Sequence, residues 1–195
     1  MKPRGRFLVL EGIDGSGKTE QTRRLAAWLE RLGHRVVSTR EPTDGPFGRR
    51  YRAWARAEFE ATPDEVLELF LEDRREHLRL VVLPALERFE IVVCDRYKDS
   101  TLAYQAAQGL DRERLRALFD TPEFPVPDLV LWLRLPVTTA LARMGAQATE
   151  RFERAEFLAR VDAEYARLGL EEVDAAGTAD DVERALRTRV ERALA

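Results

Sequence analysis

The chain has 195 residues, enough for one domain with a full-sized core, and we expect a single domain over residues 1–195. With a net charge of −3 and arginines interleaved with acidic residues, it lacks the extended basic surface that a nucleic-acid partner would require. One cysteine excludes an intramolecular disulfide, two histidines give no zinc ligand set, and no run of about 18 apolar residues predicts a membrane span, so we expect a cytoplasmic protein.

The first predicted element is a short apolar strand over Phe7–Glu11, which leads directly into a phosphate-binding loop. Residues Gly12–Thr19 fill every fixed position of the pattern G-x-x-x-x-G-K-[ST], and a helical apolar pattern follows over 25–32. Glycines in such a loop let backbone N–H groups turn toward phosphates, Lys18 adds a mobile positive charge, and the Thr19 hydroxyl can bind Mg²⁺. The sequence therefore predicts a triphosphate site. Its residues are Gly12, Asp14, Gly15, Ser16, Gly17, Lys18 and Thr19.

Further strand-like runs alternate with helical ones along the chain. They cover Arg35–Thr39, Ile91–Cys94, Leu129–Leu135 and Leu170–Val173. This alternation predicts a three-layer α/β fold, in which a five-stranded parallel sheet is flanked by helices and ligands bind at the carboxyl ends of the strands. The second strand ends in Thr-Arg-Glu-Pro and the third in Asp-Arg-Tyr, so both place charged residues where the ligand is expected.

A long helix is predicted between the second and third strands. Thr62–Glu65 forms a capping box with proline at the first helical position, and apolar residues then recur at helical spacing. Phe70 and Arg74 share one face of this helix. A second helical region is expected from about Asp99 to Phe119, and Thr178 is expected to cap the final helix.

Phosphate-binding loops occur in GTPase switches, in motor ATPases and in kinases of small molecules. Guanine-specific switches need an Asn-Lys-x-Asp motif, and this chain contains no asparagine. Motor ATPases usually occupy larger domains and carry an apolar strand that ends in adjacent acidic residues, a feature absent from this sequence. The remaining class is a kinase of small molecules.

Several short motifs follow one another over nearly the whole chain. They are Leu10–Thr19, Thr39–Pro42, Leu69-Phe70 with Asp73-Arg74, Asp95–Tyr97, Ser100–Gln105 and Pro127–Leu131. In this order they resemble the thymidylate kinases, the nucleoside monophosphate kinases that transfer a phosphoryl group from ATP to dTMP. The resemblance implies a P-loop kinase fold with a short lid, ATP and Mg²⁺ as cofactors, dTMP as acceptor and a homodimer.

The resemblance also implies roles for residues at the strand ends. Phosphoryl transfer needs the two substrates held in line and the charge on the transferring group neutralised. Arg96 matches the arginine that reaches between the acceptor phosphate and the γ-phosphate, and Asp95 with Thr19 matches a Mg²⁺ site. Asp14 matches a carboxylate that accepts a hydrogen bond from the acceptor's 3′-OH. From the residues alone, the alternative role for Arg96 is a surface ion pair, and Asp95 would then simply orient Arg96 or Lys18.

Other residues match those that bind the acceptor base and sugar. Phe70 matches the aromatic residue that stacks on thymine, although an apolar residue on an apolar helix face is also an ordinary core residue. Arg74 matches the arginine that donates to the thymine O4 atom, and Thr101 the polar residue near N3. Tyr104 matches the ring that crowds the 2′ position and disfavours ribose.

Arg52 matches a second arginine that binds the acceptor phosphate in this family, and Arg49 and Arg50 are its rivals in spacing. The acceptor residues implied by the resemblance are Asp14, Glu41, Pro42, Arg52, Phe70, Arg74, Arg96, Ser100, Thr101, Tyr104 and Gln105.

The lid is expected at about residues 143–153, where Arg143 and Arg151 would add positive charge over the ATP phosphates and exclude water. Arg143 is assigned to ATP binding. The implied catalytic residues are Lys18, Arg96, Asp14 and Arg151.

The sequence also departs from the pattern. Thr43-Asp44-Gly45 replaces the usual Gly-Gly-Thr after Thr-Arg-Glu-Pro, and the lid is poor in arginine. Two alternatives therefore stay open. One is a deoxynucleoside or other nucleotide kinase with a changed acceptor, for which Glu41 is the candidate base. The other is a non-catalytic nucleotide-binding protein of the same fold.

Overall fold

The computed structural model of the protein describes residues 5–145 and 155–195. They contain a five-stranded, all-parallel sheet in the order β2-β3-β1-β4-β5. Its strands are β1 (Arg6–Glu11), β2 (Val36–Arg40), β3 (Ile91–Asp95), β4 (Leu129–Arg134) and β5 (Glu171–Asp174). In the middle of the sheet, Leu8 of β1 pairs with Val93 on one side and Leu129 on the other. The predicted α/β fold with a parallel sheet is confirmed.

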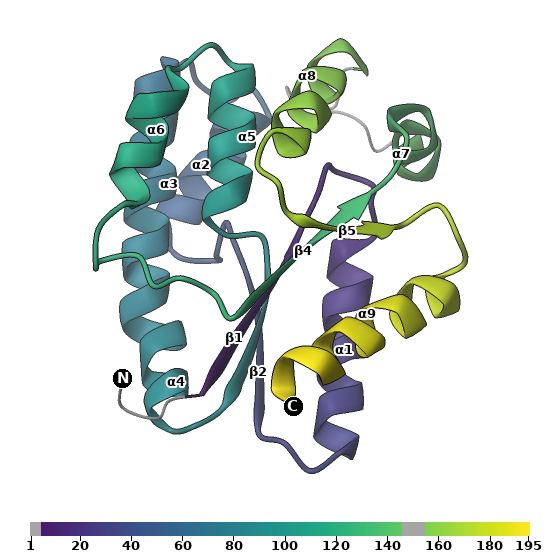
Figure 1. The fold of residues 1–195 in the computed structure, drawn as a ribbon. Helices are drawn as coiled ribbons and strands as arrows, with labels where there is room; N and C mark the ends of the chain where they lie inside the picture. Colours follow the sequence, from purple (N-terminus) through teal and green to yellow (C-terminus); the bar gives the residue numbers. More distant parts are fainter. Residues whose placement is uncertain (1–4, 146–154) are drawn as a thin grey trace.

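Helices flank this sheet on both faces (Figure 1). They are α1 (Lys18–Arg31), α2 (Pro46–Ala55), α3 (Pro63–His77), a π-helical turn η1 (Leu78–Val82), α4 (Leu83–Glu87), α5 (Lys98–Ala107), α6 (Arg112–Phe119), α7 (Val137–Met144), α8 (Ala155–Ala166) and α9 (Ala179–Leu194). The capping boxes at Thr62 and Thr178 both form, so α3 and α9 begin where the sequence predicts.

The region predicted to be helical from Asp99 to Phe119 is two helices rather than one. After α5 the chain turns at Gly109, whose φ of 100° lies in the left-handed region that favours glycine. Asp111 then caps α6 by accepting a hydrogen bond from the backbone N–H of Arg114 at 2.8 Å. The glycine and the cap residue separate two helices that apolar periodicity alone had merged.

The two faces of the sheet bury alternate residues of β1 in separate apolar cores. Leu8 and Leu10 pack with residues of α1 and α9, whereas Phe7 and Val9 pack with residues of α3, η1, α4 and α6. Figure 1 shows α1 and α9 together on one side and α3, α4 and α6 on the other. Cys94 is fully buried in β3, and burial raises the pKa of its thiol.

Within the described ranges, no helix has the length and apolar character needed to cross a membrane.

Candidate active site

The phosphate-binding loop joins the carboxyl end of β1 to the first turn of α1. Gly17 occupies the cap position of α1 with φ of 89°, and Gly15 has φ of 79°. A Cβ atom on Gly15 would lie 2.5 Å from the carbonyl oxygen of Ala140, so only glycine fits against α7 there. Lys18, 5% exposed, donates from Nζ to the Ile13 carbonyl at 2.8 Å. The loop and the start of α1 thus form the backbone cradle that a polyphosphate requires.

A hydroxyl and a carboxylate meet beside this cradle. Thr19 Oγ1 donates a hydrogen bond to Asp95 Oδ2 at 2.6 Å, which joins α1 to the end of β3. The other carboxylate oxygen, Asp95 Oδ1, is buried and has no hydrogen-bond partner among the described residues. No group of three His, Cys, Asp or Glu side chains within those residues could hold a metal unaided. One carboxylate and one hydroxyl fit Mg²⁺, which keeps several waters and takes other ligands from phosphates.

Arg96 stands at the centre of the site, immediately after β3. Its backbone has φ of 71°, a left-handed conformation that is uncommon for a residue with a side chain, and its N–H donates to the Leu10 carbonyl at 2.9 Å. The guanidinium reaches the phosphate-binding loop, where Nη1 donates to the Gly12 carbonyl at 2.9 Å and Nη2 donates to Asp14. Arg96 therefore links the end of β3 to the loop.

Asp14 and Tyr104 complete this contact. The Tyr104 hydroxyl donates to Asp14 Oδ2 at 2.8 Å, and Arg96 lies 5.0 Å from the centre of the Tyr104 ring. Burial pulls the pKa of Asp14 upward, but the charges of Arg96 and Lys18 outweigh it and the pKa lies below its ordinary value. Asp14 is therefore an ionised acceptor, shared between the loop and α5.

A cavity of about 800 Å³ opens from these residues toward α2 and α3. Phe70 lies in its wall with its ring centre 4.4 Å from that of Tyr51. The predicted site residues that line the cavity are Asp14, Gly15, Gly17, Lys18, Thr19, Glu41, Pro42, Arg52, Phe70, Asp95, Arg96, Ser100, Tyr104 and Arg143. One cavity thus brings together most of the residues assigned to the donor and to the acceptor.

A model of the thymidylate kinase family matches residues 10–185 of the chain. Among similar curated proteins, the thymidylate kinase of Xanthomonas campestris pv. campestris (strain B100) is 44% identical over 100% of this chain and 87% of its own. That of Xanthomonas oryzae pv. oryzae (strain PXO99A) is 42% identical over the same shares. That of Desulfotalea psychrophila (strain LSv54 / DSM 12343) is 37% identical over 97% of this chain and 96% of its own. The chain belongs to the thymidylate kinase family. It is an enzyme, a phosphotransferase.

The remaining predicted residues of this kinase are not among those that line the cavity, or lie outside the described part of the chain. Gly12, Ser16, Arg74, Thr101 and Gln105 do not line the cavity, and Arg151 falls outside the described residues. Arg143 lines the cavity and donates to the Ala175 carbonyl at 3.1 Å. Of the three rival arginines, Arg52 alone is in the wall, because Arg49 turns to the Asp44 carbonyl and Arg50 lies over the Phe59 ring.

Arg74 is held by a buried ion pair. It is 1% exposed, donates from Nε to Glu41 at 2.8 Å and donates from Nη2 to Thr101 at 3.0 Å. His77 Nδ1 lies 2.9 Å from the second oxygen of Glu41. Burial raises the pKa of Glu41, but Arg74 and His77 more than reverse this effect and lower it. Arg74 Nη1 is buried without a partner among the described residues, so one donor is left over at this position.

Sequence reasoning gave no role to Glu11, Tyr51, Arg40 or Tyr165. Glu11 is fully buried beneath the loop, and Tyr165 of α8 donates to it at 2.9 Å. Tyr51 and Arg40 line the cavity. The local signal for Glu11 and Arg40 was a charged residue at the end of a predicted strand. Nothing near Tyr165 in the sequence indicates a partner 154 residues away.

Affinity for ATP is expected to fall as the pH rises through about 8. Burial, helped by the neighbouring charge of Arg96, lowers the pKa of Lys18 to about 8 in the free protein. A phosphate chain binds the charged lysine, so above this pH binding requires proton uptake and weakens by up to about tenfold per pH unit. Equilibrium titration with ATP between about pH 7.5 and 9.5 measures the slope. Lys18→Arg keeps its charge and should flatten it; equal affinity for the wild type across this range would contradict the prediction.

Proposed function

We propose that the protein transfers the γ-phosphoryl group of ATP to dTMP, giving dTDP and ADP, with Mg²⁺. The observation that carries this proposal is the junction of Asp14, Arg96 and Tyr104. In it a residue of the phosphate-binding loop shares hydrogen bonds with the residue that follows β3 and with a residue of α5. A cavity with aromatic rings at one side and the phosphate-binding loop at the other suits two nucleotides meeting at their phosphates.

In this proposal each residue has a chemical task. The loop amides and Lys18 bind the donor phosphates, and Arg96 and Arg52 supply charge at the acceptor phosphate. Asp14 accepts a hydrogen bond from the sugar hydroxyl, and Phe70 stacks on the base. Arg74 does not line the cavity in the free protein, but its Nη1 has no partner among the described residues, and it is the expected donor to the base. Mg²⁺, when bound near Thr19 and Asp95, supplies positive charge on the phosphate oxygens.

The environment of Glu41 tests the alternative that the acceptor is an unphosphorylated nucleoside. A kinase of unphosphorylated nucleosides needs a carboxylate base for the 5′-OH, and Glu41 was the candidate. Its oxygens are instead 2.7 Å from Arg74 Nη2 and 2.9 Å from His77 Nδ1, and its pKa is lowered rather than raised. A carboxylate held in this way is a weak base. The arrangement favours an acceptor that already carries its phosphate.

The decisive experiment offers dTMP, dUMP, UMP, CMP and thymidine separately with Mg·ATP and measures the nucleotide products. We expect turnover to be fastest with dTMP. Phosphorylation of thymidine but not of dTMP would replace the proposal with a deoxynucleoside kinase. ATP binding without consumption with any of the five would favour the non-catalytic alternative.

Replacing Phe70 with alanine is expected to raise KM for dTMP about tenfold or more and to change kcat little. Stacking a base on an aromatic ring contributes about 1 to 3 kcal/mol, and it acts on the bound acceptor before and during transfer. Phe70→Leu keeps apolar volume beside Tyr51 and should show a smaller rise. Steady-state kinetics with varied dTMP distinguish the cases, and an unchanged KM for the alanine variant would refute the stacking role.

Three further features belong to the proposal as expectations of the family. They are a homodimer, a cytoplasmic location and a lid at about residues 143–153 carrying Arg143 and Arg151. Molecular mass in solution tests the first, and an Arg151→Ala variant with varied ATP tests the last.

A further inference from the structure

Asp44 binds two arginines that line the cavity. Its Oδ1 atom lies 3.0 Å from Arg40 Nη2 and 3.0 Å from Arg52 Nη2, and its Oδ2 atom lies 3.1 Å from Arg40 Nη2. Arg52 also donates from Nη1 to the Pro42 carbonyl at 3.2 Å. The guanidinium groups of Arg40 and Arg52 are therefore both engaged with this one carboxylate.

Hydrogen bonds from Thr43 to Asp73 of α3 fix the backbone next to Asp44. The buried carboxylate of Asp73 accepts hydrogen bonds from the Thr43 N–H at 2.8 Å and from its hydroxyl at 2.6 Å. The Gly45 N–H donates to the same hydroxyl at 3.0 Å. Asp44 itself is 75% exposed. This stretch, Thr43-Asp44-Gly45, is the one at which the sequence departs from the expected Gly-Gly-Thr.

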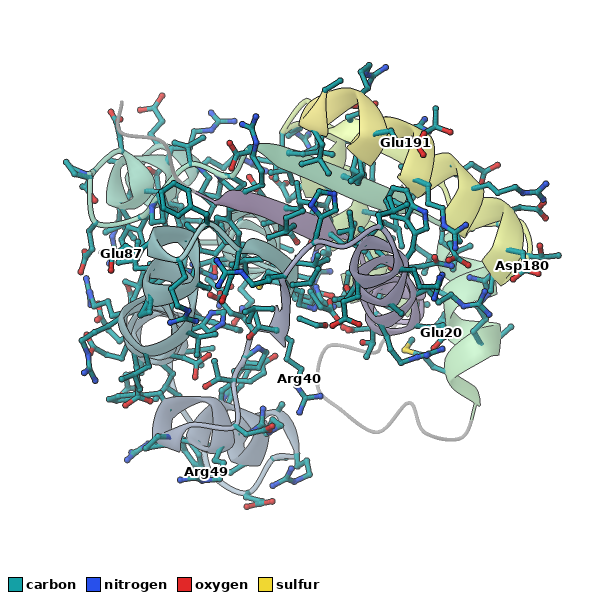
Figure 2. The ribbon with its side chains drawn as sticks, turned by 90° about the horizontal axis from the view of Figure 1, so that it is seen from below. Glu20, Arg40, Arg49, Glu87, Asp180 and Glu191 are labelled. Atoms are coloured by element: carbon teal, nitrogen blue, oxygen red, sulfur yellow. The ribbon has the colours of Figure 1, made fainter. Side chains whose placement is uncertain are left out.

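The two arginines that pair with Asp44 lie at the cavity rather than on a distant part of the protein surface. Arg40 and Arg52 border the same cavity as Phe70 and Arg96. Figure 2 shows the labelled Arg40 reaching away from the sheet, between α1, which carries Glu20, and α2, which carries Arg49. A phosphate that binds Arg52 from the cavity brings about two negative charges to a guanidinium that already holds a carboxylate. The two anions compete for the same donors.

We propose that Asp44 is an internal competitor for the phosphate of the acceptor: it holds Arg52 and Arg40 in the free enzyme, and the incoming monophosphate must displace it. The inference rests on the proposed function, because it takes the acceptor to carry its phosphate near Arg52. Asp44 is a positioning residue acting through Arg52. It weakens binding of every phosphorylated acceptor and leaves the nucleoside portion unaffected.

Calorimetric titration of Asp44→Asn with dTMP and with thymidine tests this directly. Exposed ion pairs are individually weak, so losing both should tighten dTMP binding about three- to tenfold, with a matching fall in KM and little change in kcat. Thymidine has no phosphate, and its affinity should stay as in the wild type. Asp44→Glu keeps the charge and should bind dTMP as the wild type does.

A matched control removes one negative charge elsewhere. Glu172 pairs with Arg134 at 3.0 Å, and both side chains are about half exposed away from the cavity lining. Glu172→Gln should leave dTMP affinity unchanged. In an Arg52→Ala background, Asp44→Asn should lose most of its effect, because the shared partner is gone.

Three results would overturn the inference: unchanged dTMP affinity in Asp44→Asn, weaker dTMP affinity, which would make Asp44 an aid to Arg52, or thymidine affinity rising by the same factor. Failure of the proposed function would give a different result from failure of this inference. The wild type would then bind or convert dTMP no better than the other acceptors of the panel, and the inference would fall with it.

Discussion

Arg96→Ala is expected to lower kcat by about a thousandfold or more while leaving the affinity for ATP nearly intact, because charge supplied to a transferring phosphoryl group acts mainly in the transition state. Arg96 is placed for this by β3, by its left-handed backbone and by hydrogen bonds to the Gly12 carbonyl and Asp14. Steady-state kinetics give kcat, and equilibrium titration with ATP gives the donor affinity.

Arg96→Lys is the matched variant for this prediction. Lysine keeps the positive charge but loses the planar fork that donates at once to Gly12, Ser100 and Asp14. Its kcat should fall between those of the wild type and the alanine variant. A kcat for Arg96→Ala within a few fold of the wild type would assign Arg96 to structure alone.

Much of the fold could be predicted because its signals are local. Each strand starts or ends within about one residue of its predicted limits, since a buried parallel strand is a short apolar run bounded by turns. The capping boxes at Thr62 and Thr178 likewise involve residues three apart. The break between α5 and α6 has local signals too, Gly109 and the cap residue Asp111, but the helical region expected from the sequence runs across both.

The candidate site could be predicted where its residues follow strands. Lys18, Thr19, Asp95 and Arg96 all stand at the carboxyl edge of the sheet, and parallel strands bring such residues together. Pairings over long distances in the sequence were not predictable in the same way. Arg74 has the spacing of a ligand residue, yet its main partner is Glu41 across a buried ion pair.

The contacts of Asp44 were likewise not predictable from the sequence. The sequence shows an acid after Thr43, but not that the carboxylate turns toward Arg40 and Arg52. That direction depends on the hydrogen bonds from Thr43 to Asp73, which belongs to another helix.

Glu11 supports the second large effect, which is on stability. It is fully buried, and its two oxygens accept hydrogen bonds from four donors: the backbone N–H groups of Tyr97 and Ser100, the Ser100 hydroxyl and the Tyr165 hydroxyl. These donors come from the turn after β3, from α5 and from α8. One carboxylate therefore fixes the turn that carries Arg96 and anchors α8 against the loop.

Glu11→Ala is expected to lower the free energy of unfolding by about 3 to 5 kcal/mol, because it leaves buried donors unpaired. For a chain of this size that corresponds to a fall in melting temperature of roughly 6 to 20 °C. Ser100→Ala removes one donor and leaves Glu11 paired, so it should cost only about 1 kcal/mol. Denaturant unfolding measures both. Equal losses for the two variants would contradict the role assigned to Glu11.

The pH dependence of Glu11→Gln separates the charge of this residue from its hydrogen bonds. Burial, together with the nearby Asp99, raises the pKa of Glu11 from 4.5 to about 7. The folded protein therefore keeps a proton that the unfolded chain releases above pH 4.5, and this contribution to stability is lost as the pH rises through about 7. The glutamine side chain does not titrate in this pH range. The free energy of unfolding of Glu11→Gln, relative to the wild type, should thus increase by up to about 3 kcal/mol between those pH values. A difference that stays constant with pH would mean that Glu11 is ionised throughout, with its four donors outweighing its burial.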